Sequence, residues 1–290
     1  MSDTEFFDAE KNKVIGGTLY LVTTPIGNMS DMTYRAVKVL SEVDFVAAED
    51  TRNSARLLRF FSINKELVSY HEHNKKSAGE KILARLQSGE SCALVTDAGT
   101  PAVSDPGEDL VRLCADAGIP VTAAPGVSAA VTALTLSALD TRRFVFEGFL
   151  PVGGERAERL AALQSETRTI VLYEAPHKLR RTLADLADAL GGERRISLCR
   201  ELTKLNEEVF RTTLADAAAY YADAEPRGEY VLILAGAVER GVQNAPWASL
   251  SVAEHVDMYI AKGLTKSDAI KKAAKDRGVP KNVVYNEYVR

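Results

Sequence analysis

The 290-residue sequence lacks the features of several specialised protein classes. Its three cysteines, Cys92, Cys114 and Cys199, form no CxxC pair, and an odd, scattered set argues against a disulfide framework. No apolar run approaches the roughly 20 residues of a membrane-spanning helix, and the polar, acidic start lacks the basic and apolar regions of a signal peptide. We therefore expect a soluble protein of the reducing cytoplasm with no membrane partner, in which residues 1–15 form a flexible tail.

The common glycine-rich nucleotide motifs are also missing. Neither GxGxxG nor GxxxxGK[ST] is present, which disfavours NAD and nucleoside triphosphates as cofactors. His71 and His73 are close together, but His177 and His255 are distant in sequence and no cysteine stands near the pair. Because exposed turn histidines explain the pair equally well, we predict no metal site.

Charge is unevenly distributed along the chain. The formal net charge of −4 weighs against nucleic acid as a partner. From Ser251 onward, however, six lysines and two arginines stand against five carboxylates, so this segment carries +3 and the rest −7. A basic C-terminal segment on an acidic body is a hint of contact with nucleic acid.

Short apolar runs rich in β-branched residues alternate with longer segments of helical period, which predicts an α/β fold. The first set of strands is expected at 18–23, 44–48, 67–70, 93–96 and 121–123. The second set is expected at 144–147, 169–172, 196–199, 208–212 and 230–234. Helices are expected at 81–86, 110–117 and 179–190, among others. A short loop separates two strands of the second set, which indicates hairpins and so a mixed second sheet, whereas the first sheet should be parallel.

The pattern also divides the chain into domains. Pro125 and Gly126 interrupt it, so we place an N-terminal α/β domain at 16–124 and a second α/β domain at 125–240. The segment 246–290 consists of three short helical pieces and resembles a helix-turn-helix module. Such helical trios contact nucleic acid in some proteins and serve dimerisation or packing in others, and both interpretations stay open.

Three turns that follow predicted strands combine Gly or Pro with small polar residues. They are 24–28, 96–101 and 125–128. In open α/β sheets, ligands bind beyond the carboxyl ends of the strands, where small residues let the backbone approach the ligand closely. Any one of these is explained as a tight turn, but three together predict the wall of a cofactor site.

Four polar clusters follow other strands, at 49–52, 71–74, 173–177 and 200–204. Helix N-caps are the plainer explanation of each cluster, but caps do not require the neighbouring Arg52, Arg200 and Lys204. A cleft with these cations would attract an anionic substrate such as RNA. The carboxylates able to accept a proton there are Glu49, Glu174 and Glu201. The residues alone thus predict an α/β enzyme with a small cofactor and an anionic substrate.

The stretch 17–28, together with 48–52, 97–101 and 173–177, resembles the ribosomal RNA small subunit methyltransferase I family of the tetrapyrrole methylase superfamily. The similarity runs from about Gly16 to Gly236, and 200–204 also conforms. Tetrapyrrole-modifying relatives usually carry a Gly-Asp-Pro turn where this chain has 96–101, which favours the RNA branch. The resemblance implies a two-lobed tetrapyrrole-methylase-like fold and a homodimer.

The resemblance also implies a reaction and its residues. The reaction is transfer of methyl from S-adenosylmethionine to the ribose 2'-hydroxyl of a decoding-centre cytidine in 16S rRNA of the small ribosomal subunit. The motif positions that would bind the cofactor are Pro25, Ile26, Asp97, Thr100, Ser128, Ala129 and Tyr173. The candidates for contact with RNA are Arg52, His71, Asn74, Glu174 and Arg200. The candidates for the proton acceptor are Glu49, Glu201 and Lys204, although such carboxylates often hold an arginine in place instead.

Two other functions compete with this hypothesis. The same cofactor could methylate a corrin or porphyrin precursor. The acceptor distinguishes this function from RNA methylation, because it would be a tetrapyrrole and not a small ribosomal subunit. Alternatively, the body could sense a metabolite while residues 251–290 bind DNA, in which case loss of that segment would abolish function.

Overall fold

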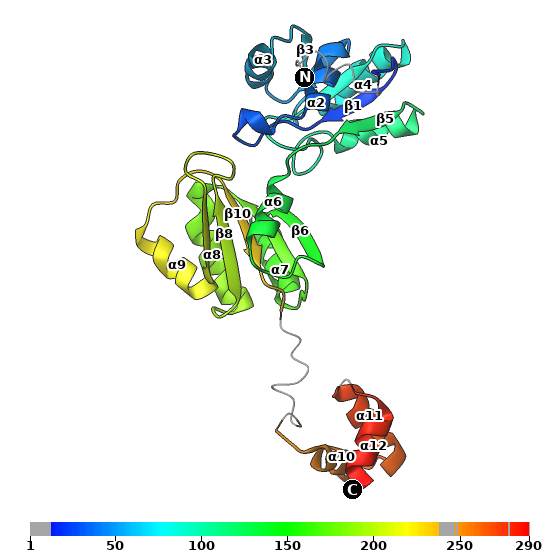
Figure 1. Ribbon diagram of the computed structural model, residues 1–290, viewed down its shortest axis with the longest axis vertical. Helices are drawn as coiled ribbons and strands as arrows, with labels where there is room; N and C mark the ends of the chain where they lie inside the picture. Colours follow the sequence, from blue (N-terminus) through cyan, green and yellow to red (C-terminus); the bar gives the residue numbers. More distant parts are fainter. Residues whose placement is uncertain (1–12, 238–246, 248, 278, 290) are drawn as a thin grey trace, which may run out of the picture. The chain divides into compact units, whose positions relative to one another are not determined.

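The computed structural model describes residues 13–237, 247, 249–277 and 279–289. These form two compact units, one of Met1–Leu163 with Arg168–Ala235 and one of Gln164–Thr167 with Gly236–Arg290, as far as their residues are described. The first unit contains two β-sheets, and the second contains the C-terminal helices (Figure 1). Most of the predicted N-terminal tail lies outside the described residues.

The first sheet is parallel and has five strands in the order β3-β2-β4-β1-β5. Its strands are β1 (Leu19–Val22), β2 (Phe45–Ala48), β3 (Glu66–Ser69), β4 (Cys92–Val95) and β5 (Val121–Ala124). Strands β2 and β4 are buried at every position, which explains why they are continuous apolar runs rather than alternating ones. The carboxyl ends of all five strands lie along one edge, where the predicted turns begin.

Helices cover both faces of this sheet. They are α2 (Tyr34–Glu42), α3 (Thr51–Phe60), α4 (Lys75–Gln87) and α5 (Glu108–Asp116), with a 3₁₀ turn η1 (Met29–Asp31). Val39 and Leu40 of α2 and Leu58 of α3 pack with Val22 and Val46. The alternate residues of the same strands form the other face, on which α4 and α5 pack. The alternation of side chains along each strand therefore builds two cores from one sheet.

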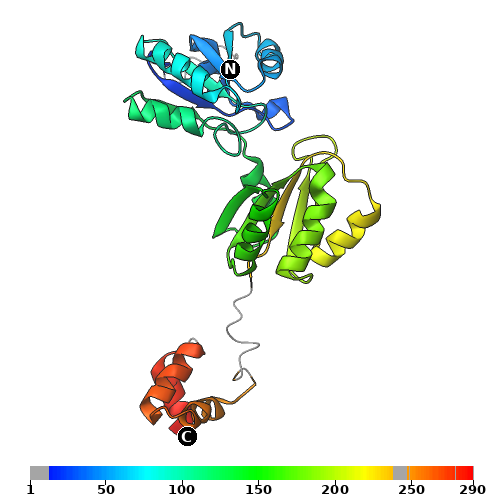
Figure 2. The same ribbon diagram turned by 180° about the vertical axis from the view of Figure 1, so that it is seen from behind.

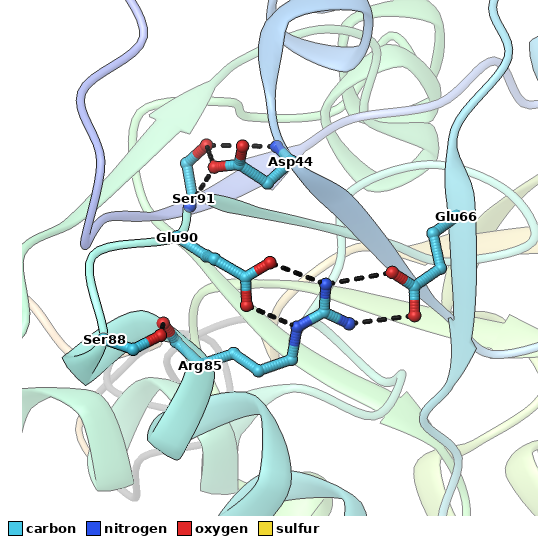
Figure 3. A network of polar contacts seen from close by, with 6 residues as sticks. All are labelled: Asp44, Glu66, Arg85, Ser88, Glu90 and Ser91. Carbon is cyan, nitrogen blue, oxygen red and sulfur yellow. Dashed lines mark hydrogen bonds and ion pairs between the residues drawn. The ribbon is translucent and has the colours of Figure 1, made fainter.

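An ion-pair clasp joins the amino-terminal ends of the strands (Figure 3). The Arg85 guanidinium on α4 donates to both carboxylate oxygens of Glu66 at 2.9 Å and to those of Glu90 at 2.7 and 2.9 Å. It also stacks over the Phe45 ring, 3.6 Å from the centroid. Because Phe45 begins β2, Glu66 begins β3 and Glu90 lies two residues before β4, one side chain holds three neighbouring strands at the end opposite the predicted site.

The second sheet is mixed, in the order β6-β7-β10-β8-β9. Its strands are β6 (Phe144–Phe149), β7 (Thr169–Glu174), β8 (Arg195–Arg200), β9 (Glu208–Thr213) and β10 (Tyr230–Leu234). Only β6 and β7 pair in parallel, and the other neighbours are antiparallel. The helices on this sheet are α6 (Ala129–Leu136), α7 (Gly154–Gln164), α8 (Pro176–Leu190) and α9 (Leu214–Asp223). Helix α6 packs on one face and the other three on the opposite face.

The C-terminal unit consists of α10 (Val252–Ala261), α11 (Lys266–Asp276) and α12 (Lys281–Val289), seen from behind in Figure 2. Ser251 and Glu254 form a capping box at the start of α10. The His255 ring is fully buried, stacks on Trp247 at 4.5 Å, and accepts a hydrogen bond at Nδ1 from Arg277 Nε at 3.0 Å. This unit therefore has a small core of its own.

The predicted α/β class, parallel first sheet, mixed second sheet and helical C-terminal end are confirmed. Each of the ten predicted strands is present, with ends that differ by at most two residues from the predicted ones. The division into separate α/β domains at 124/125 stays a prediction, since both sheets belong to one compact unit. The predicted start of the C-terminal module at 246 lies outside the described residues. No helix in the described part of the chain is both long and apolar enough to cross a membrane.

Candidate functional site

The three turns predicted from the sequence lie against one another at the carboxyl edge of the first sheet. Thr24 and Gly99 form an isolated antiparallel bridge, with N–H to O distances of 2.9 and 3.0 Å. The Thr24 hydroxyl donates to the Thr96 carbonyl at 3.1 Å, and the Thr100 hydroxyl donates to the Val127 carbonyl at 3.4 Å. The hydrogen bonds therefore join turns 24–28, 96–101 and 125–128 into one continuous wall.

A cavity of about 650 Å³ lies along this wall, within the size range of sites for small molecules and cofactors. Six of the seven residues predicted to bind a cofactor line it: Ile26, Asp97, Thr100, Ser128, Ala129 and Tyr173. Pro25 does not line the cavity and is buried. The second sheet contributes Phe149 and Tyr173, whose rings lie edge to face with centroids 5.6 Å apart. The structure thus brings together residues of both sheets around one space.

Three carboxylates line the cavity on the side of the first sheet: Glu49, Asp97 and Asp105. Glu49 Oε2 accepts a hydrogen bond from the Thr96 hydroxyl at 2.9 Å, and Asp97 Oδ2 accepts one from Asn53 Nδ2 at 3.0 Å. Burial raises the pKa of Asp105 to about 6, and the charges of Glu49 and Asp97 contribute to the rise, whereas a hydrogen bond from Thr96 opposes it. These groups give the cavity a negative wall that suits a positively charged ligand.

Lys204, a predicted proton acceptor, also lines the cavity but is fixed as an ammonium group. Its Nζ donates to Glu201 Oε1 and to Glu229 Oε2, both at 2.8 Å. Burial lowers the pKa of Lys204, but the hydrogen bonds to Glu201 and Glu229 outweigh this, so the pKa is raised. The hydrogen bond from Lys204 in turn lowers the pKa of Glu201, which does not line the cavity. This arrangement favours a structural role for both residues over proton transfer.

The stem of Lys204 lies directly over Gly27 in the first turn. A Cβ atom at Gly27 would stand 2.4 Å from Lys204 Cγ, and the glycine has a φ of 145°, a conformation that other residues rarely adopt. Glycine at this position therefore allows the loop after β8 to approach the loop after β1. This contact joins the two sheets beside the cavity.

Glu174 lines the cavity, but its carboxylate is used within the protein. Only 4% of the residue is exposed; Oε1 accepts from the Ala175 N–H at 2.8 Å, and Oε2 accepts from the Thr182 hydroxyl. Both partners belong to the start of α8 or its first turns, so Glu174 fixes that helix to the end of β7. Contact of this carboxylate with RNA stays a prediction that the geometry does not favour.

The other four predicted RNA contacts, Arg52, His71, Asn74 and Arg200, do not line the cavity. Asn74 shapes a turn, since its Oδ1 accepts from the His71 N–H at 2.8 Å and its Nδ2 donates to the Ser69 carbonyl at 3.1 Å. Arg200 pairs with Glu208 at 3.4 Å. Arg52 pairs with Asp50, the N-cap of α3, but its side chain is 86% exposed and accessible to an anionic partner.

Sequence reasoning missed several residues of the cavity. The chief ones are Val103, Ser104, Asp105, Phe149 and Glu229. A local signal existed for Asp105, because Ser104-Asp105-Pro106-Gly107 continues the turn-forming composition of 96–101. Glu229 had only the weaker signal of standing directly before a strand. Among the described residues, no group of three or more His, Cys, Asp or Glu is placed to hold a metal ion.

The fold and the cavity define the class of protein. Residues 18–218 match the family Tetrapyrrole (Corrin/Porphyrin) Methylases, and the chain belongs to this family. Its fold is similar to that of the uroporphyrin-III C-methyltransferase of Thermus thermophilus, solved in complex with S-adenyl homocysteine. That likeness has a TM-score of 0.55 and 19% sequence identity, and covers 75% of this chain and 97% of the other.

Two curated relatives identify the particular family. The chain is 48% identical over 277 residues to the ribosomal RNA small subunit methyltransferase I of Halalkalibacterium halodurans, covering 94% of each chain. It is 46% identical over 270 residues to the protein of the same name from Synechocystis, covering 93% of this chain and 96% of that one. Within the tetrapyrrole methylases, the chain belongs to the ribosomal RNA small subunit methyltransferase I family.

Proposed function

We propose that this protein transfers a methyl group from S-adenosylmethionine to the ribose 2'-hydroxyl of cytidine 1402 in 16S rRNA. The observation that carries the proposal is the cavity along the three joined turns, in a chain whose relatives over more than nine tenths of its length are named ribosomal RNA small subunit methyltransferase I. The chemistry of the cavity and its surroundings supports each component of the reaction.

The cavity fits S-adenosylmethionine in size and in charge. Its volume of about 650 Å³ suits a nucleoside-sized ligand. The small residues Gly99 and Ala129 let backbone approach the ligand closely, and Tyr173 and Phe149 offer aromatic surface. The sulfonium and ammonium groups of S-adenosylmethionine are positive, so the cavity carboxylates on the side of the first sheet complement them. When bound, the cofactor supplies a methyl group already activated by the positive sulfur.

The protein's own contribution is to align the acceptor hydroxyl and to exclude water. Tyr173 lies between Phe146 and Phe149, with ring centroids 5.1 and 5.6 Å away, which fixes its orientation at the cavity wall. The Lys204 stem over Gly27 keeps the loops of the two sheets together beside the cavity. These contacts fix the cavity wall against which the reacting groups would align.

The RNA substrate requires positive charge around an otherwise acidic body. Arg52 is exposed at the start of α3, and its planar guanidinium can form two hydrogen bonds to one phosphate. The lysines of α11, which include Lys271, Lys272 and Lys275, are exposed in the C-terminal unit. We propose that the acceptor is the small ribosomal subunit in the cytoplasm and that the active form is a homodimer.

Transfer of labelled methyl from S-adenosylmethionine to three purified acceptors tests the proposal. The acceptors are small subunits lacking this modification, free 16S rRNA and uroporphyrinogen III. Label in RNA of the subunits supports the proposal. Label in uroporphyrinogen III alone would replace the RNA function with tetrapyrrole methylation, and cofactor binding without any transfer would also contradict it.

A further inference from the structure

The exposed side of helix α3 carries three arginines and an aromatic ring. This arginine face consists of Arg52, Arg56, Arg59 and Phe60, all of them exposed. Steps of three and four residues separate the arginines, so they lie on one side of the helix, opposite the buried Leu58. Phe60 is 65% exposed and continues the row of Arg52 and Arg56 at the same spacing of four. The helix thus presents a strip of positive charge that ends in a ring.

The charge of this face is not neutralised by the protein itself. Helix α3 contains three arginines and no carboxylate, so its side chains carry +3 in a chain with a net charge of −4. Among the described residues, no carboxylate pairs with Arg56 or Arg59. By contrast, Arg112 on α5 and Arg181 on α8 each pair with a carboxylate four residues away. The positive charge of α3 therefore stays available to an anion from outside.

Helix stability does not explain where the arginines stand. Arg59 lies in the last turn, where a cation favours the helix dipole. Arg52 lies in the first turn, where a cation opposes the dipole, and the N-cap Asp50 offsets this by pairing with it at 2.7 Å. Arg56 is near the middle of the helix. Two of the three arginines thus gain nothing from the dipole.

The first turn of α3 adjoins the cavity. Glu49, which precedes the N-cap, lines the cavity, and Asn53 Nδ2 donates to Oδ2 of Asp97 in the cavity wall at 3.0 Å. From Arg52 to Arg59 the helix rises about 10 Å. The arginine face therefore leads away from the cavity along the outside of the first sheet. A strand whose ribose enters the cavity would have its neighbouring phosphates along this face.

Single-stranded RNA matches the chemistry of the arginine face. Each guanidinium can form two hydrogen bonds to one phosphate. Binding sites for single strands combine cations that follow the backbone with aromatic rings on which bases stack. The Phe60 ring is supported edge to face by Phe61, with centroids 5.0 Å apart. An acidic protein segment would also attract the arginines, but the adjacent ring favours a partner with flat bases.

We propose that the arginine face of α3 binds the backbone of the 16S rRNA strand that flanks the acceptor nucleotide, with one base stacked on Phe60. This inference rests on the proposed function and names the surface that holds its substrate. The role is binding and orientation of the RNA.

The test compares the wild type with the double variant Arg56→Gln/Arg59→Gln and with Phe60→Leu. The control Arg112→Gln/Arg181→Gln removes the same charge from α5 and α8, where both side chains are exposed. Affinity for free 16S rRNA and for unmodified small subunits is measured over a series of salt concentrations. Methyl transfer to the subunits gives KM and kcat, and calorimetry gives cofactor affinity.

For Arg56→Gln/Arg59→Gln we expect RNA affinity at least about tenfold lower and KM for subunits raised by a similar factor, with kcat and cofactor affinity unchanged. The plot of log affinity against log salt should become shallower by about 1.4, since each phosphate contact with a single strand contributes about 0.7. Phe60→Leu should weaken RNA binding at least about fivefold without changing this slope, because it removes a stacking surface but no charge. The control should match the wild type.

An RNA affinity and a salt slope in Arg56→Gln/Arg59→Gln equal to those of the control would overturn the proposal. So would weaker binding to subunits alone with free 16S rRNA bound as tightly as by the wild type, which would assign the arginine face to a protein of the subunit. An unchanged affinity in Phe60→Leu would refute the stacked base. If the wild type binds RNA but methylates none, the proposed function fails, whereas the comparison of RNA affinities still decides the role of α3.

Discussion

Replacing Asp105 with asparagine should stabilise the protein at alkaline pH, although it removes a residue of the active cavity. The pKa of Asp105 is raised from 3.8 to about 6 in the folded chain, chiefly by burial. A carboxyl with a raised pKa stabilises the fold when protonated, and that stability is lost as the pH rises through the folded pKa. Because Asp105 is only half-buried and solvent screens its charge, the raised pKa corresponds to about 1–2 kcal/mol of destabilisation above pH 7, less than the roughly 3 kcal/mol expected for an unscreened group. Asparagine carries no charge and can donate to the Thr96 oxygen, so it avoids this cost.

Urea unfolding of the wild type and the variant at pH 5 and pH 8 measures this effect. By linkage, the stability advantage of Asp105→Asn should grow by about 1 kcal/mol between the two pH values. Asp116→Asn, on the exposed end of α5, is the control for loss of one negative charge. An advantage that is the same at both pH values, or a variant less stable than the wild type at pH 8, would refute the reasoning.

Three further substitutions probe the contacts that shape the site. Gly27→Ala should reduce methyl transfer at least about tenfold, because the added Cβ displaces Lys204. The control Gly153→Ala also has positive φ but open space around it, so it should cost only about 1–2 kcal/mol of stability and leave methyl transfer intact. Equal transfer rates in the two variants would contradict this. Lys204→Met should destabilise the fold by about 1–3 kcal/mol, since Glu201 and Glu229 lose their shared cation, and urea unfolding that shows no loss would argue against the ion pair. Arg85→Met should lower the free energy of unfolding in urea by about 1–2 kcal/mol, because the ion-pair clasp is lost. Cofactor affinity measured by calorimetry should not change, and an altered affinity would mean that the clasp acts on the site.

Much of the fold is predictable because its strands are local apolar runs. Strands β2 and β4 are buried on both faces, so Phe45–Ala48 and Cys92–Val95 are apolar throughout and stand out in the sequence. The three turns were predictable for a related reason, since Gly and Pro mark each of them directly after a strand. Parallel strands then bring these turns to the same edge.

The chemistry of individual side chains was less predictable because it depends on distant partners. Lys204 was expected as a proton acceptor, but Glu229, 25 positions away, helps to fix it as an ammonium. Glu174 was expected to face RNA, but its carboxylate meets Thr182 on the next helix. The turn composition at 104–107 marked the position of Asp105, but its raised pKa was not predictable, because it depends on burial and on Glu49, neither of which is visible in local sequence.

The central claim is that the methyl group goes to a ribose hydroxyl of 16S rRNA in the small ribosomal subunit. The most direct measurement is mass spectrometry of nucleosides and of nuclease fragments from small subunits methylated by the purified protein with labelled S-adenosylmethionine. We predict a single labelled product, 2'-O-methylcytidine, located in the decoding-centre fragment. Label on a base, label spread over many nucleotides, or no label in RNA despite intact cofactor binding would contradict the claim.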